Sequence, residues 1–235
     1  MDSFCTLVKN YKKTIGWAGL KKYNLYWLFI IFDKLINYIS FRSAVPTPFF
    51  SSNQLEIMGL DVSALQLGRW QEKGYLVQLK RGIYLFADRQ NQISGFTIAQ
   101  LLYQPSYISL QTALFEYGII PDVTGVITSV TTKATRSYAR PFGAFDYRSI
   151  KADLFWGYSE VSTGEDRYLL ADPQKAILDF LYYNAAQIRS KEDILGLRLD
   201  PISIRDLMAT DKFVQYQKAY ANPKIDQLVE LLGPC

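Results

Sequence analysis

Residues 62–86 restrict the possible folds of the chain most strongly. In this segment a helical pattern is followed directly, without a linker, by a strand–turn–strand pattern. The helical part covers residues 62–73 and ends at Gly74, a residue suited to the position just after a helix. Wound at about 100° per residue, this helix places Leu67 and Trp70 on one side, which is predicted to face a core. The opposite side offers an amide, a guanidinium and an ammonium group, from Gln66, Arg69 and Lys73.

The strand–turn–strand pattern consists of two β-rich runs around a basic turn. The runs are residues 75–79 and 83–86, and the turn between them is Lys80-Arg81-Gly82. Glycine readily adopts the positive φ that a tight hairpin needs. The sequence therefore predicts a β-hairpin directly after the helix, with two cations at its tip.

Two further helical segments precede this pair of elements. Residues 25–40 repeat apolar residues at spacings of three and four, which predicts a buried helix. After Pro46 and Pro48, Ser51 is suited to cap a short helix that ends at Gly59. Two short helices joined by a glycine-containing turn, then a basic hairpin, are typical of a winged helix-turn-helix. We therefore predict such a domain over residues 25–90, after a poorly assigned N-terminal extension, residues 1–24.

The residue types of this segment fit duplex DNA. Glutamine and arginine can pair with adenine and guanine edges in the major groove, and lysine more often meets phosphate. Residues 1–95 contain 12 Lys and Arg against 6 Asp and Glu, whereas residues 96–235 contain 14 against 16, so the front half carries the positive charge. An amphipathic surface helix with a solvated polar face is the alternative. The candidate DNA-binding residues are Ser63, Gln66, Arg69, Lys73, Lys80 and Arg81.

Residues 91–235 are predicted to form an α+β domain with mostly antiparallel strands and C-terminal helices. Hairpins are expected around Pro141-Phe142-Gly143 and Thr163-Gly164-Glu165. Asp172 and Pro173 are expected to open a helix, with the aspartate as its N-cap. The remainder is expected to form three short helices, broken at Pro201 and Pro223.

A second basic set lies in this region and is interleaved with the aromatic residues Tyr138, Phe142 and Tyr147. Cations alternating with aromatic rings can form a nucleic-acid surface. Equally, the rings can belong to the core while the cations form a solvated edge that discourages sheet association. The set comprises Lys133, Arg136, Arg140, Arg148 and Lys151.

Several function classes are excluded or disfavoured by composition. The chain has no histidine, which excludes Ser-His-Asp and Cys-His nucleophiles and histidine-ligated zinc. Its two cysteines, Cys5 and Cys235, suggest no disulfide framework, so a cytoplasmic location is expected. The longest apolar run, residues 25–32, is far shorter than the roughly 20 residues of a membrane span. The carboxylates are scattered, and we expect no enzyme activity, metal or cofactor.

The string Leu67-Gly-Arg-Trp-Gln-Glu-Lys-Gly-Tyr-Leu-Val-Gln-Leu-Lys-Arg-Gly-Ile-Tyr84 resembles the winged helix of AbiEi-like antitoxins, from type IV toxin–antitoxin systems. Four downstream segments are similar to later motifs of that family, in the same order. The resemblance covers about residues 35–200. The four segments are residues 107–121, 127–133, 141–148 and 171–181.

The resemblance implies a cytoplasmic repressor that binds promoter DNA with inverted repeats through its winged helix, regulates its own promoter and takes part in phage defence. It also implies an antitoxin that opposes a nucleotidyltransferase-like toxin without forming a stable complex. Two alternatives stay open at this point. One is a protein-interaction module that does not bind DNA, and the other is a metal-dependent nuclease or nucleotidyltransferase.

Overall fold

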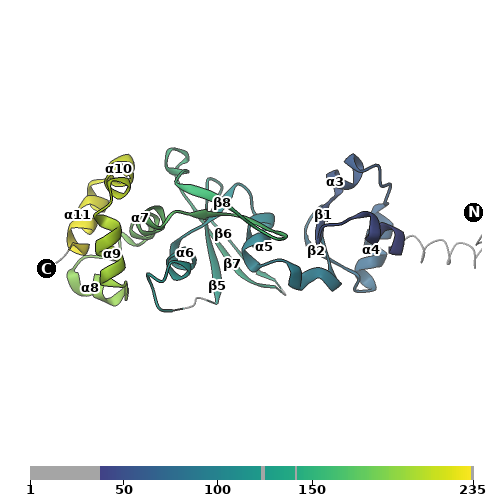
Figure 1. Ribbon diagram of the computed structural model, residues 1–235, viewed down its shortest axis with the longest axis horizontal. Helices are drawn as coiled ribbons and strands as arrows, with labels where there is room; N and C mark the ends of the chain where they lie inside the picture. The colour runs from purple at the N-terminus through teal and green to yellow at the C-terminus, as the bar shows by residue number, and fades with distance from the viewer. Residues whose placement is uncertain (1–37, 123–124, 141, 234–235) are drawn as a thin grey trace, which may run out of the picture. The chain divides into compact units, whose positions relative to one another are not determined.

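The computed structural model describes residues 38–122, 125–140 and 142–233 (Figure 1). Its contacts divide the chain into two compact units, and each is described by itself. The smaller unit contains the described residues 38–47 together with Leu55–Asp61. Residues 38–44 are helical, so the helix predicted over residues 25–40 is present at residues 38–40 and continues to residue 44, beyond its predicted end. Residues 25–37 of the prediction, and the predicted extension, lie outside the described residues.

The larger unit begins with a three-stranded antiparallel sheet of order β1-β3-β2. Its strands are β1 (Phe49–Ser51), β2 (Leu76–Lys80) and β3 (Ile83–Phe86). Between β1 and β2 the chain forms α3 (Ser52–Ile57), which crosses from one unit to the other, and α4 (Ala64–Glu72), which packs against β2. The predicted hairpin and the two helices before it are thus present.

A six-stranded sheet follows, in the order β6-β7-β5-β4-β9-β8. Three of its pairs are antiparallel, as the sequence predicts for most of the strands, whereas β5 pairs with β7 and β4 with β9 in parallel. Both expected hairpins are formed, by β6 with β7 and by β8 with β9. The strands are β4 (Ser106–Ile108), β5 (Val126–Thr131), β6 (Arg136–Arg140), β7 (Gly143–Ser149), β8 (Tyr158–Thr163) and β9 (Asp166–Ala171).

Helices cover both faces of the six-stranded sheet. One face packs on α5 (Gly95–Leu102), and the other packs on α6 (Leu110–Glu116) and α7 (Pro173–Asn184). Because successive residues of a strand point to opposite faces, the neighbours Tyr107 and Ile108 lie in different cores. Short 3₁₀ turns at Ala87–Gln92 and Ala152–Leu154 connect these elements.

The core on the α5 side is continuous with the three-stranded sheet. It contains Leu79 of β2 and Leu85 of β3 together with Ile108, Phe145 and Tyr147 of the six-stranded sheet. The boundary predicted at residue 90 lies within the 3₁₀ turn that follows β3. That this boundary separates two independent domains stays a prediction.

The C-terminal part forms four helices, not the three predicted. They are α8 (Lys191–Gly196), α9 (Pro201–Met208), α10 (Asp211–Tyr220) and α11 (Pro223–Leu232). The missed break lies between α9 and α10, where the Thr210 hydroxyl accepts a hydrogen bond from the Phe213 N–H. No proline or glycine marks this break, and a threonine cap is a weaker signal in the sequence.

Asp172 occupies the predicted N-cap position of α7, but its side chain makes no capping hydrogen bond. The carboxylate instead accepts a hydrogen bond of 2.9 Å from the Tyr216 hydroxyl and forms an ion pair of 2.8 Å with Lys212. It therefore fastens α10 to the start of α7. No helix in the described segments is long and apolar enough to cross a membrane.

Candidate nucleic-acid interface

Helix α4 has one buried face and one face open to solvent. Leu67 and Trp70 are buried, while Arg69 and Lys73 are exposed and Gln66 is half-buried. Within the part of the chain that the structure describes, neither Arg69 nor Lys73 forms an ion pair with a carboxylate. The polar groups expected on this face are therefore available to an outside partner.

The start of α4 is fixed by Ser63. This residue is the N-cap, and its hydroxyl accepts a hydrogen bond of 3.2 Å from the Gln66 N–H. The helix starts two residues later than predicted because the cap occupies that position. Ser63 is exposed, and its hydroxyl proton can still be donated to an anion at the helix N-terminus.

The hairpin of β2 and β3 carries its two cations at the turn. Arg81 is exposed and Lys80 half-buried. Gly82 has a φ of 78°, which favours glycine, and its carbonyl accepts a hydrogen bond of 2.9 Å from the Ser52 N–H. This bond anchors the tip of the hairpin to the first residue of α3.

Two members of the second basic set come together beside α5. The Lys133 ammonium lies 5.7 Å from the ring centroid of Tyr103, and the Arg136 guanidinium lies 6.0 Å from that centroid and 5.6 Å from the centroid of Tyr138. Both cations are exposed. Arg136 pairs in register with Tyr147, whose hydroxyl donates to the carbonyl of Ala99 in α5, so Arg136 lies on the α5 side of the sheet.

The other members of that set come from β6, β7 and the residues just after β7. Arg148 lies on the opposite side of the sheet from Tyr147 and forms an ion pair of 2.8 Å with Asp146. It borders a cavity of about 350 Å³ that Gln111 of α6 and the residues at the end of α7 also line. Lys151 is exposed just after β7, and Arg140 is the last residue of β6. The pleat of the sheet therefore places Arg148 on the opposite side from Arg136.

One residue of the second set affects the hairpin tip electrostatically. Partial burial lowers the pKa of Lys80, and the positive charge of Lys133 lowers that pKa further. The two lysines are far apart in the sequence, one at the end of β2 and the other in the turn between β5 and β6, so no sequence pattern could relate them. The sequence analysis also missed Tyr103 as a contact of Lys133 and Arg136. A tyrosine at the end of a helical segment carries no particular signal.

Comparison with known proteins identifies the segment that carries α4 and the hairpin. Residues 47–87 match the family model of the transcriptional regulator AbiEi antitoxin. This match confirms the resemblance seen in the sequence, for that segment, and it supports a general role as an antitoxin and regulator. No curated protein matches the chain significantly.

The AbiEi-like segment contains all six candidate DNA-binding residues, and their assignment to DNA stays a prediction. The second basic set lies downstream of this segment. Among residues 38–122, 125–140 and 142–233, no three Asp, Glu, Cys or His side chains come together as a metal site.

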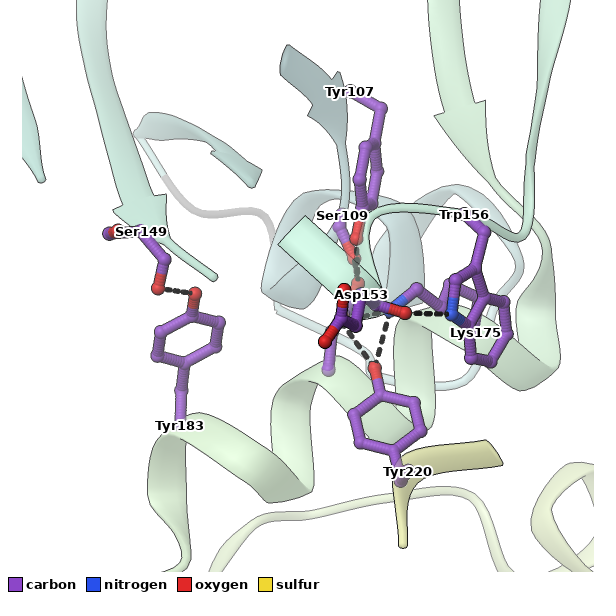
Figure 2. A network of polar contacts seen from close by, with 9 residues as sticks. Tyr107, Ser109, Ser149, Asp153, Trp156, Lys175, Tyr183 and Tyr220 are labelled. Atoms are coloured by element: carbon purple, nitrogen blue, oxygen red, sulfur yellow. Dashed lines mark hydrogen bonds and ion pairs between the residues drawn. The ribbon is translucent and has the colours of Figure 1, made fainter. Parts of the chain in front are cut away.

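A buried ionic network that the sequence did not suggest lies at the start of α7 (Figure 2). Lys175 and Asp179 form an ion pair of 2.7 Å with no exposure of either side chain. The Lys175 ammonium lies 4.7 Å from the ring centroid of Trp156. The Asp179 carboxylate also accepts hydrogen bonds from three hydroxyls. The three hydroxyls belong to Tyr107, Ser109 and Tyr220. The network joins β4, α7 and α10.

Proposed function

We propose that the protein is a DNA-binding repressor in which α4 enters the major groove and the β2–β3 hairpin acts as a wing. The observation that carries this proposal is the division of α4 into a buried apolar face and an exposed face bearing Arg69 and Lys73, next to a basic hairpin. Both elements lie in the AbiEi-like segment. Residues 25–90 would then form the winged helix-turn-helix.

Each candidate residue has a role suited to its chemistry. Gln66 and Arg69 would read base edges, since an amide can pair with adenine and a guanidinium with guanine. Phosphate contacts would come from the rest of the set, which supplies cations and one hydroxyl at a helix N-terminus. This second group comprises Ser63, Lys73, Lys80 and Arg81.

The biological setting follows from the family match. We propose that the protein represses its own promoter at inverted repeats and acts in the cytoplasm as the antitoxin of a type IV system. Its functional partner would be a nucleotidyltransferase-like toxin, opposed without a stable complex, and the protein itself would not be an enzyme. A nucleotidyltransferase-like reading frame beside this gene, toxic when expressed alone and harmless when co-expressed, would support this part of the proposal.

Binding to the DNA upstream of the protein's own reading frame tests the DNA-reading role. Binding is measured by fluorescence anisotropy against a shuffled duplex of equal length and composition. The double variant Arg69→Ala/Arg81→Ala should lose the preference for the upstream duplex, because it removes a base-reading and a phosphate-binding side chain. The matched control, Arg205→Ala/Lys218→Ala, removes one exposed arginine from α9 and one exposed lysine from α10, and it should keep the preference. Equal affinity of the parent and the first variant would show that the site is wrongly assigned.

Leu65 favours a second candidate function. Its side chain is 66% exposed beside the polar face of α4, as in a surface that docks another protein. A protein-interaction module would bind duplex DNA weakly and without sequence preference. The upstream and shuffled duplexes would then give the same affinity, and Leu65→Ser would leave that affinity unchanged.

A further inference from the structure

Two cations, Lys133 and Arg136, lie together around the turn between β5 and β6 without a carboxylate to balance them. Both lie over the ring of Tyr103, and the positive charge of Lys133 also lowers the pKa of Lys80 at the tip of the β2–β3 hairpin. In the described ranges neither of the two forms an ion pair with a carboxylate. Like charges held together raise the free energy of the protein alone, and an anion placed between them would lower it.

From this pair of cations we propose that Lys133 and Arg136 form a phosphate-binding site for the backbone of duplex DNA, in addition to the contacts proposed for α4 and the hairpin. The inference rests on the proposed function, which it extends from the AbiEi-like segment to the turn between β5 and β6. The site supplies affinity and no base specificity, because phosphates are the same at every step of the duplex.

The turn that carries Lys133 is held in place before any ligand arrives. The Tyr103 hydroxyl donates a hydrogen bond of 3.0 Å to the carbonyl of Ala134. The Thr131 hydroxyl accepts one of 3.2 Å from the Lys133 N–H and donates one of 2.6 Å to the carbonyl of Pro105. A backbone that is already fixed loses less conformational entropy when a ligand binds, so this turn is suited to bind phosphate.

The position of the cations favours phosphate over unstacked bases. Proteins that bind single strands leave aromatic faces open, so that bases can stack on them. Here Lys133 and Arg136 lie over the ring of Tyr103, and Arg136 also lies over that of Tyr138. These rings therefore hold the cations, and the guanidinium and ammonium groups remain as donors to phosphate oxygens.

The salt dependence of DNA binding tests the inference. In the double variant Lys133→Gln/Arg136→Gln, the association constant should fall less steeply with salt. The magnitude of the slope of log K against log salt should decrease by about two, one for each cation, on the upstream and the shuffled duplex alike. Lys133→Arg/Arg136→Lys keeps both charges and should keep the slope. Arg205→Gln/Lys218→Gln removes two exposed cations from α9 and α10 and should also keep it. Thermal melting checks that each variant is folded.

The shuffled duplex separates this inference from the proposed function. A parent that binds both duplexes equally contradicts base reading by α4, yet a slope reduced only in the glutamine variant still supports the phosphate site. An unchanged slope in that variant overturns the site, as does a parent that binds neither duplex. Duplex RNA that competes as well as DNA, and loses affinity equally in the variant, overturns the assignment to DNA.

Discussion

Lys175 and Asp179 face each other one turn apart in α7, with their charged atoms 2.7 Å apart and neither side chain exposed. Burial lowers the pKa of Lys175, and the nearby Asp179 carboxylate opposes that shift. The pair is stable in this position because the Tyr220 hydroxyl bonds to both partners, at 2.5 Å from each. Such a network makes the fold dependent on each of its members.

Asp179→Asn should therefore be strongly destabilising. The substitution leaves a buried ammonium group without a counter-charge, which costs about 3–5 kcal/mol in comparable cases. Urea denaturation followed by circular dichroism measures the loss. The double variant Lys175→Met/Asp179→Asn removes the orphaned charge and should be more stable than the single variant. A single variant as stable as the parent would contradict this account.

Asp166 should stabilise the start of α5. Its carboxylate accepts hydrogen bonds of 2.6 Å from the Ser94 N–H and 2.8 Å from the Thr97 hydroxyl. Partial burial raises the pKa of Asp166, but these hydrogen bonds outweigh it and hold the pKa below its ordinary value of 3.8. The stabilisation is present above pH 3.8 and is lost as the pH falls through the lower, folded-state value. Asparagine keeps an oxygen acceptor but loses the charge, so we expect Asp166→Asn to cost about 1 kcal/mol at neutral pH, the difference between a charged and a neutral acceptor.

Denaturation curves at several pH values check this expectation. The stabilities of the parent and of Asp166→Asn should approach each other in strong acid. A constant difference at all pH values would show that the charge of Asp166 is not what stabilises α5.

Tyr117 should make the fold sensitive to alkali. Burial, and then the nearby Asp172 carboxylate, raise the pKa of Tyr117 from 10.0 to about 12. The unfolded chain therefore loses this proton at a lower pH than the folded protein, so stability falls as the pH rises from 10 towards 12. Tyr117→Phe should make that fall shallower, although it also removes the 2.9 Å hydrogen bond to the carbonyl of Ala171. Unfolding midpoints between these pH values test the prediction, and an unchanged fall would contradict it.

Two glycines of the AbiEi-like segment should respond oppositely to alanine. Gly82 has a φ of 78°, so Gly82→Ala should cost about 1–2 kcal/mol through backbone strain. Gly68 lies inside α4, and a Cβ there meets no atom within 4 Å. Gly68→Ala should therefore stabilise the protein by about 0.5–1 kcal/mol. Melting temperatures of the two variants provide the test, and shifts of the same sign would contradict it.

Arg69 and Lys80 should affect DNA binding in different ways. Arg69→Ala should cost about 1–3 kcal/mol on the upstream duplex and little on a shuffled one, if the guanidinium contacts a base. Lys80→Ala should weaken binding to both duplexes alike and flatten the salt dependence, as expected of a phosphate contact. Anisotropy titrations at several salt concentrations separate the two effects. A uniform loss in Arg69→Ala would assign that residue to phosphate.

Local patterns in the sequence predicted the elements that depend on local chemistry. The period of α4, its end at Gly74 and the hairpin turn at Gly82 follow from side-chain spacing and backbone freedom. The parallel pairing of β5 with β7 was missed, because the β6–β7 hairpin returns β7 beside β5 and no local signal encodes that order. The break at Thr210 was missed for want of a proline or glycine.

The electrostatic features were the hardest to predict. Lys175 and Asp179 are four residues apart in a helix, a spacing that normally indicates a solvated pair. Their burial depends on Tyr107 and Tyr220, which come from distant parts of the chain. The effect of Lys133 on the pKa of Lys80 likewise depends on tertiary packing.

The hydrophobic core shared by the two sheets bears on how the protein can be dissected. Leu79 and Leu85 are almost completely buried, in one cluster with Ile98 of α5 and Phe145 of β7. A fragment that stops at residue 90 would lack α5 and the six-stranded sheet, so both leucines would be exposed to water. Such a fragment is prone to aggregate. A graft of the hairpin and α4 onto another regulator would therefore have to include α5, or replace these two leucines with polar residues.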